Sequence, residues 1–448
     1  MVNIITTICR FVLIFLITIY TFTSLNVLRD KPEKKKRGMY SRMVFLIFVI
    51  HFTGYLVIFL NLNTVEALVL YGAEVLYLTL TLSIYPLIYP QMNRALLNNM
   101  CFFLVIGAIL LARLNFDKAV KQFIIVCIAT VITLIVPYLM NRFRQLERYK
   151  WVYCALGIIL LGAVLVSGVV TLGAKLSINL GFISIQPSEF VKVIFVFYVA
   201  SFLCDATDFK SVVLVTCFAA AFVMILVLST DLGSALIFFV VYMFMLFVAT
   251  KKGWYLLAGF GAGGAAAVAA YKLFSHIRVR VMVWQDPWSD PRGKGMQICE
   301  SLFALGAGGW FGVGLFKGMP KSVPLVEKDF IFAAIGEEMG GFVAVLIILM
   351  CLSTFMIFVK IGMNQKNNFY KLLAVGFGIS YAFQVFLTVG GSMKMIPLTG
   401  VTLPLVSYGG SSAISTIFVF SVVQGLNIIG KEDERRIYEQ NKSETVKG

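Results

Sequence analysis

The chain has 448 residues, of which 60% are hydrophobic and only 13% are charged, and its formal net charge is +16. A mean hydropathy of +0.90, with repeated long apolar runs, excludes a soluble domain, because about 20 consecutive apolar residues match the thickness of a bilayer core. The runs are continuous and do not alternate every second residue, which predicts an all-α polytopic membrane protein and not a β-barrel. The basic residues stand in short loops, so they indicate membrane topology and contact with anionic lipid, and no nucleic-acid partner is expected.

The first apolar run, Phe11–Val27, is followed by the basic cluster RDKPEKKKRG. No small-residue cleavage site follows the run, so we interpret it as a membrane span and not as a signal peptide. The cluster predicts a cytoplasmic anchor, which places the N-terminus outside. Two more spans are predicted at Met43–Leu62 and Ala67–Leu87, and residues 1–95 therefore form an N-terminal part of about three helices.

From Leu96 onward the apolar runs follow one another regularly. Seven spans are predicted before a long polar interruption: Leu96–Leu111, Phe123–Leu139, Val152–Leu172, Val191–Cys204, Val212–Leu228, Ala235–Ala249 and Trp254–Leu273. Three follow the interruption: Phe330–Val359, Leu372–Val389 and Val406–Ile429, with a polar tail from Lys431. With about thirteen helices, the short basic loops, the first basic cluster and the tail all fall on one side, which predicts an outer N-terminus and a cytoplasmic C-terminus.

The polar interruption runs from His276 to Gly341 and is rich in charged residues, tryptophan, proline and glycine. Its polar part ends on Asp329, at the mouth of the next apolar run, where an acid is costly to hold and is therefore a functional-site candidate. Other unusual polar stretches also fall at the outer ends of predicted helices: Gln186–Lys192, Thr230–Ser234 and Thr402–Ser412. Their common membrane face predicts an outward-facing cavity.

Several polar residues in these stretches have a structural and a functional interpretation. Glu189 and Lys192 are three apart, so they either form a salt bridge at a helix start or position an anionic group in the cavity. Asp231 is interpreted as the cap of the helix that follows it. Of Glu337 and Glu338, one is expected to pair within the bundle, and a proton path is the weaker alternative.

Arg278 and Arg280 either mark the interfacial end of a helix or bind a diphosphate, because arginine forks contact phosphate oxygens in pairs. The glycines of ALGAGGWFGVGL lack the GKS or GKT ending of a phosphate loop, so nucleotide binding is not predicted. The eight cysteines form no CxxC pair and the two histidines are scattered, so neither a disulfide framework nor a zinc site is indicated.

Taken together, QPSEFVK, DLGSALIFF, RVRVMVWQDPWSDPRGKGMQ, SLFALGAGGWFGVGL, DFIFAAIGEEMG and TGVTLPLVSYGGSS resemble the motifs of the SEDS (shape, elongation, division and sporulation) family. This family includes FtsW, RodA and SpoVE. The resemblance covers about Leu96–Ile429, so it implies a ten-helix core at 96–430, with an extension at 1–95 and a polar tail at 431–448. Its most specific motif includes Ser407, Tyr408, Gly409, Gly410 and Ser411.

The resemblance implies a peptidoglycan glycosyltransferase that polymerises lipid II on the outer face of the bacterial cytoplasmic membrane, with undecaprenyl pyrophosphate as leaving group. Such enzymes serve cell division, cell shape or sporulation, and they work with a class B penicillin-binding protein that crosslinks the strands. The family's catalytic aspartate falls on Asp329. Its QPSE glutamate and the lysine that follows fall on Glu189 and Lys192.

The implied chemistry suits these residues. A sugar hydroxyl loses a proton as it attacks the anomeric carbon of the donor, and the carboxylate of Asp329 can accept that proton. The departing pyrophosphate builds up negative charge, which Arg278, Arg280 or a divalent cation (Mg or Mn) could stabilise; no other cofactor is expected.

The chain departs from the family at PLVEKD, where members usually have Pro-Glu-x-His-Thr-Asp, so that Pro324 and Asp329 remain and Lys328 replaces threonine. Glu300 also stands where glutamine is common. Two alternatives are a flippase for a lipid-linked precursor, and a catalytically weak scaffold for a penicillin-binding protein. A flippase would need polar groups that continue to the cytoplasmic helix ends, where the sequence shows no comparable cluster.

Overall fold

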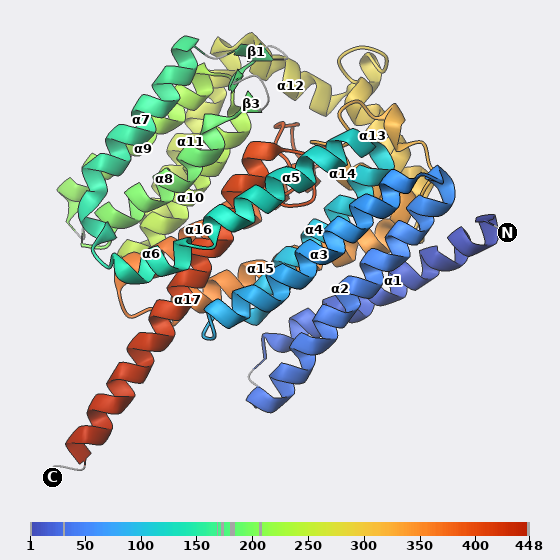
Figure 1. Ribbon diagram of the computed structural model, residues 1–448. Coiled ribbons are helices and arrows are strands. Elements are labelled where there is room, and N and C mark those ends of the chain that lie inside the picture. Colours follow the sequence, from blue (N-terminus) through green and yellow to red (C-terminus); the bar gives the residue numbers. More distant parts are fainter. Residues whose placement is uncertain are drawn as a thin grey trace.

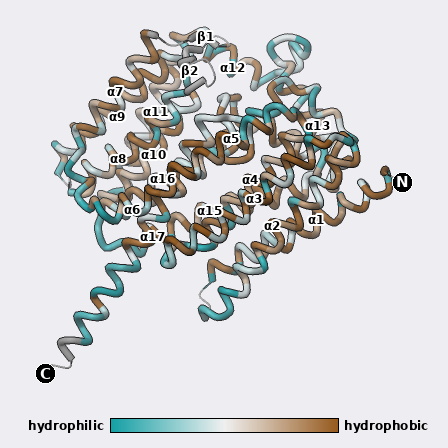
Figure 2. Tube along the Cα trace, in the orientation of Figure 1, coloured by the Kyte–Doolittle hydropathy of each residue, from teal (hydrophilic) through white to brown (hydrophobic). Residues whose placement is uncertain are grey.

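The computed structural model describes residues 2–29, 32–167, 169–171, 174–179, 184–205 and 208–445. They form a bundle of long helices, with hydrophobic residues along the bundle and hydrophilic residues at its ends (Figures 1 and 2). Among these residues, twelve helices are long and apolar enough to cross a membrane. The apolar helix α8 (Pro187–Leu203) has 17 residues, just below a usual span, and 15 of them are buried, so α8 lies inside the bundle.

The N-terminal extension consists of α1 (Val2–Val27), α2 (Glu33–Leu62) and α3 (Val65–Ile88). Figure 1 shows these helices on the side of the bundle away from α7 (Lys150–Ser167). They are attached to the rest of the bundle by a buried polar seam, whose members are Tyr20 and Ser24 on α1, Asn99 on α4 (Arg94–Leu114), and Ser353 and Thr354 on α15 (Gly341–Met363). Such hydrogen bonds between helices fix their positions where water is absent.

The seam is tight. The Ser24 hydroxyl lies 2.8 Å from that of Ser353 and donates to Asn99 Oδ1 at 3.1 Å, while Asn99 Nδ2 donates to Thr354 Oγ1 at 3.2 Å. Ser24, Asn99, Ser353 and Thr354 are all fully buried. The extension therefore packs as part of the bundle.

The remaining helices before the polar interruption are α5 (Phe116–Thr133), α6 (Val136–Arg142), the 3-10 helix η1 (Leu146–Tyr149), α7, α8, α9 (Phe209–Leu228), α10 (Leu232–Thr250) and α11 (Gly253–Leu273). The predicted span Phe123–Leu139 is divided between α5 and α6, with Pro137 in the first turn of α6, where a missing N–H costs least. The predicted span Val152–Leu172 extends too far, because α7 ends at Ser167. A small antiparallel sheet follows in the order β1 (Val169–Thr171), β2 (Ala174–Asn179), β3 (Ser184–Ile185).

The polar interruption is largely structured. It contains α12 (Ser275–Gln285), η2 (Pro287–Ser289), α13 (Met296–Gly308), η3 (Pro320–Ser322), α14 (Ile331–Ala334) and the π-helical turn η4 (Ile335–Met339) before α15 begins. The prediction of one continuous helix over Phe330–Val359 is wrong, because the chain breaks at Gly340, whose φ of +96° is a conformation that glycine adopts readily.

The glycine-rich segment after α13 packs directly on this break. Val313 N donates to Glu337 O and Gly314 N to Glu338 O, each at 2.9 Å, and Gly341 N donates to Gly309 O at 2.8 Å. A Cβ on Gly308 would lie 1.9 Å from the carbonyl oxygen of Gly336, so only glycine allows this approach. The glycines that resemble a phosphate loop in the sequence are therefore packing residues.

The last two helices are α16 (Asn368–Ser392) and α17 (Gly410–Thr445). The predicted polar tail from Lys431 begins as a continuation of α17, which projects from the bundle (Figure 1). Arg144 donates to Asp433 at 2.7 Å and to Glu432 at 3.2 Å, which ties the base of this projection to the loop after α6.

Candidate active site

The backbone of residues 327–329 is held by three hydrogen bonds. Tyr408 N donates to the carbonyl of Glu327 at 2.7 Å, the Ser407 hydroxyl donates to the carbonyl of Lys328 at 2.6 Å, and the Ser392 hydroxyl donates to the carbonyl of Asp329 at 3.3 Å. The segment 402–408 and the end of α16 thus fix the position of Asp329, although they are far from it in the sequence.

Asp329 is half-buried as a residue, and its carboxyl group lies beside the backbone of Gly400. Gly400 has a φ of +77°, and a Cβ built on it would lie 3.9 Å from Asp329 Oδ2. Burial raises the pKa of Asp329 to about 6; the positive charges of Lys328 and Arg280 oppose this rise, and the negative charge of Glu327 adds to it. A carboxylate with this pKa is both largely ionised and basic near neutral pH, as a general base requires.

The two arginines of α12 lie differently. Arg280 Nη1 donates to the carbonyls of Leu398 at 3.1 Å and Thr399 at 3.3 Å. Its guanidinium also interacts electrostatically with the carboxylates of Asp231 and Asp329. Arg278 is exposed. It precedes Arg280 by two residues, which corresponds to about 200° around an α-helix, so the two side chains lie on different sides of α12. The structure brings only Arg280 close to Asp329.

Lys118, at the start of α5, was not singled out from the sequence. Its ammonium group pairs with Glu327 and lies 5.7 Å from the centre of the Tyr408 ring. Burial alone would raise the pKa of Glu327, but the hydrogen bond and charge of Lys118, with the local backbone and Lys328, hold it below its usual value. Lys118 therefore keeps Glu327 ionised two residues from Asp329.

Glu189 and Lys192 form a buried network on the first turns of α8. Lys192 Nζ donates to Glu189 Oε2 at 2.8 Å and to Gln384 Oε1 at 2.7 Å, and the Ser415 hydroxyl donates to the same Glu189 oxygen at 2.9 Å. The salt-bridge interpretation of this pair is thus confirmed. The pair also takes part in a wider network, because Gln384 Nε2 donates to the carbonyl of Thr402 at 3.0 Å.

The polar stretches that the sequence places on one face do meet. The Ser188 hydroxyl donates to Asp231 Oδ2 at 2.8 Å, and Gln186 N donates to Ser411 Oγ at 2.9 Å. Asp231 also accepts from Ser234 N at 3.1 Å, which confirms that it caps α10. Residues 186–192, 231–234 and 402–412 therefore form one polar layer next to the 327–329 segment.

The motif residues Ser407, Tyr408, Gly409, Gly410 and Ser411 link the parts of this layer. Ser407 binds Lys328, Tyr408 binds Glu327 and Ser411 accepts from Gln186, as described above. Gly409 N donates to Gln122 Oε1 at 3.3 Å, and α17 begins at Gly410. These residues contact the backbone around Asp329, which makes them supporting residues in this geometry.

Glu337 and Glu338, the two acids that follow Asp329, are both buried, and both accept hydrogen bonds from the loop that precedes Asp329. Glu338 Oε1 pairs with Arg113 at 2.9 Å and accepts from Phe316 N at 3.0 Å, while Glu337 Oε1 accepts from Met319 N at 2.7 Å. The expectation that one of them pairs within the bundle is confirmed for Glu338.

Three supporting residues, Lys118, Arg113 and Gln384, were missed from the sequence. Gln384 had a usable signal, because it is a polar residue inside the apolar run SYAFQVFLTV. Lys118 and Arg113 stand at helix ends, where basic residues are common, and so they had no distinctive signal.

The long apolar helices define a multi-pass membrane protein with a polar, carboxylate-bearing site at one face of the bundle. A family model described as "Cell cycle protein", covering FtsW, RodA and SpoVE, matches residues 88–430. The chain belongs to this family.

Two relatives illustrate the similarity. The chain is 34% identical over 313 residues to "Peptidoglycan glycosyltransferase RodA" of Mycobacterium tuberculosis, covering 65% of this chain and 66%, just under two thirds, of that protein. It is also 34% identical over 337 residues to "Probable peptidoglycan glycosyltransferase FtsW" of Tolumonas auensis, covering 72% of this chain and 86% of that protein.

Two solved structures share the fold. One is described as showing "structural coordination of polymerization and crosslinking by a peptidoglycan synthase complex", with a TM-score of 0.64, 24% identity, and coverage of 75% of this chain and 97% of that chain. The other is the Rod shape determining protein RodA of Thermus thermophilus, with a TM-score of 0.55, 23% identity and coverage of 75% and 96%.

Proposed function

We propose that this protein is a peptidoglycan glycosyltransferase that polymerises lipid II, with Asp329 as general base. Its support is the family membership together with one geometric observation: the three carbonyls of residues 327–329 are each hydrogen-bonded, so that a carboxyl group with a raised pKa is held in a fixed place beside Arg280. Fixed placement of a base is what proton transfer in a displacement reaction needs.

In the proposed reaction, the acceptor hydroxyl attacks the anomeric carbon of the donor and its proton passes to an oxygen of Asp329. The new glycosidic C–O bond forms as the bond to the pyrophosphate oxygen breaks. Arg280 faces this negative charge, while the exposed Arg278 could meet a phosphate only from the surface. Glu189 and Lys192 support the layer beneath through Gln384 and the segment that begins at Thr402.

A divalent cation such as Mg or Mn could also neutralise the pyrophosphate. In the part of the chain that the structure describes, no three His, Cys, Asp or Glu side chains lie close enough together to hold a metal ion. Mg is usually held by one or two carboxylates together with substrate phosphates, so such a cation would enter with the pyrophosphate. Lys328 and Arg280 are positive side chains that the chain itself offers near Asp329.

We place the protein in the bacterial cytoplasmic membrane, with the site and the N-terminus outside and the C-terminus in the cytoplasm. The distribution of basic loops and the position of the site at one helix face support this orientation. A class B penicillin-binding protein is the proposed partner, because a neighbour with the same fold belongs to a complex that couples polymerisation and crosslinking.

The test is glycan polymerisation from labelled lipid II by purified wild type and Asp329→Ala, with and without a candidate partner and with added Mg or Mn. Asp290→Ala, which removes an exposed carboxylate from the same polar segment, is the matched control. We expect glycan from wild type and the control, and none from folded Asp329→Ala. Equal product from all three would remove Asp329 from the mechanism, and no product from any would favour the scaffold or the flippase.

A further inference from the structure

The first helix of the extension touches the segment that leads to Asp329. Arg10 Nη1 donates to the carbonyl of Gly312 at 2.7 Å, and Lys317 Nζ donates to Thr7 Oγ1 at 2.9 Å. Arg10 lies far outside residues 88–430, which match the family model. The extension therefore adds a contact to a part of the core that carries the candidate base.

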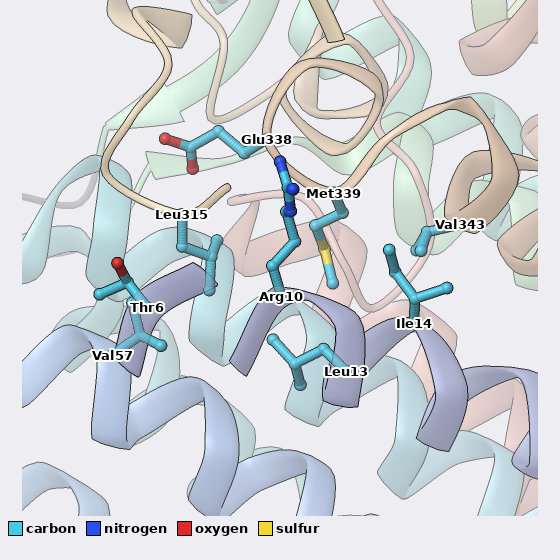
Figure 3. A pocket seen from close by; sticks show the side chains of 9 residues that line it. All are labelled: Thr6, Arg10, Leu13, Ile14, Val57, Leu315, Glu338, Met339 and Val343. Carbon is cyan, nitrogen blue, oxygen red and sulfur yellow. The ribbon is translucent and has the colours of Figure 1, made fainter. Parts of the chain in front are cut away.

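Arg10 points into a pocket between α1 and this segment. The pocket is lined by Arg10, Leu315, Glu338 and Met339 among others, and Figure 3 shows the Arg10 side chain extending from α1 toward Glu338 and Met339. Arg10 Nε and Glu338 Oε2 are both buried side-chain atoms without a hydrogen-bond partner in the described residues. Both side chains belong to the lining of the same pocket.

An arginine near the end of a membrane helix usually extends toward the interface to keep its charge in water. Arg10 departs from this pattern, because the residue is half-buried, its Nε is buried and its Nη1 donates to the backbone carbonyl of Gly312. The contact of Lys317 with Thr7 is exposed, as the ordinary pattern predicts. The two contacts between the same elements therefore differ in kind.

The contact of Arg10 is connected to Asp329 through the backbone. Beyond Gly312, the next two amides, of Val313 and Gly314, donate to the carbonyls of Glu337 and Glu338. These two acids follow Asp329 by way of the buried four-residue helix α14. A shift of Gly312 would be passed to η4 and through α14 to the base.

We propose that Arg10 is a positioning residue for Asp329, supplied by the N-terminal extension. Arg10 holds the 309–319 segment against η4 and so fixes the position of the chain that follows Asp329. This inference rests on the proposed function, because it assigns Arg10 a part in the same reaction.

Three full-length variants test it. Arg10→Met keeps an unbranched apolar stem and removes the guanidinium with its donors, Arg10→Lys keeps a charge and a donor, and Lys317→Met removes the exposed contact as a control. Two measurements are made on each: kcat and KM for polymerisation of lipid II, and hydrogen exchange at the amides of Val313, Gly314 and Phe316.

Arg10→Met should lower kcat at least tenfold, since a misplacement of 1 Å costs on the order of 100-fold, and should leave KM within about twofold. Exchange at the three amides should become faster, while exchange in α4 and α10 stays unchanged. Arg10→Lys should recover part of both effects, and Lys317→Met should behave as wild type.

Wild-type kcat and exchange in Arg10→Met would overturn the inference, and so would faster exchange throughout the bundle, which indicates general destabilisation. Equal losses in Arg10→Met and Lys317→Met would also overturn it. If the wild type makes no glycan, the proposed function fails by itself; the exchange measurement still shows whether Arg10 holds the segment.

Discussion

The charges around Asp329 allow a pH test of its proposed role as base. Lys328 and Arg280 favour its ionised form, whereas Glu327, held ionised by Lys118, disfavours it. Lys328→Thr removes a favourable charge, so the pKa of Asp329 should rise. Glu327→Gln removes an unfavourable charge and leaves Lys118 unpaired, so that pKa should fall.

The size of the effect follows from the pKa of about 6 for Asp329. One pH unit below this value about a tenth of the carboxyl groups are ionised, so the wild-type rate at pH 5 should be about a tenth of its plateau. A unit charge roughly 8 Å away, with an effective dielectric constant of about 40–80, contributes about 0.5–1 kcal/mol, or roughly two- to sixfold in the ionised-to-protonated ratio. At pH 5, Lys328→Thr should therefore be slower than wild type by about this factor, and Glu327→Gln faster.

The assay is initial-rate polymerisation of labelled lipid II between pH 4.5 and 8, with each rate expressed relative to the plateau of the same variant. Lys321→Thr, which removes an exposed lysine of the same segment, is the control and should reproduce the wild-type profile. Shifts of the acid limb in the same direction for Lys328→Thr and Glu327→Gln would refute the electrostatic reasoning. An acid limb that stays in place in both variants would mean that Asp329 is not the group that titrates.

Two further predictions concern the packing around the break before α15. Gly308→Ala should destabilise the protein by an overpacking cost of roughly 1–3 kcal/mol, seen as a lower thermal midpoint in detergent, because the new Cβ would lie 1.9 Å from the carbonyl oxygen of Gly336. Gly306→Ala, with open space around its Cβ position, should leave the midpoint unchanged. Equal midpoints for the two alanine variants would contradict this packing. Arg113→Met should destabilise by roughly 3–5 kcal/mol, since it leaves the charge of Glu338 buried without its partner, and adding Glu338→Gln in the same chain should recover much of the loss in urea titrations. A double variant no more stable than Arg113→Met would argue against the pairing.

The sequence predicts the membrane class and the grouping of the polar stretches because both depend on the order of apolar runs. An odd or even number of crossings decides on which face a loop lies, so Ser188, Asp231 and Ser411 could be placed on one face before their contacts were known. The motif resemblance added Asp329 as the candidate base. Its surroundings depend on which helices pack together, and the sequence does not contain that information in a local pattern.

Other differences have local causes. The run after Phe330 is apolar without interruption, so hydropathy alone gives one span, although Gly336 and Gly340 were signals of a break. Arg278 and Arg280 were treated as a pair because they are close in the sequence. The helical period separates them, and only the packing of α12 decides which one faces Asp329.

The length of α17 has a practical consequence. At 1.5 Å per residue, its 36 residues extend about 54 Å, whereas a bilayer core is only about 30 Å thick. Arg144 fixes the helix to the bundle through Glu432 and Asp433, so the part of α17 up to these residues moves with the bundle. A fluorophore attached to α17 close to Asp433 would therefore report the tilt of the bundle in the membrane.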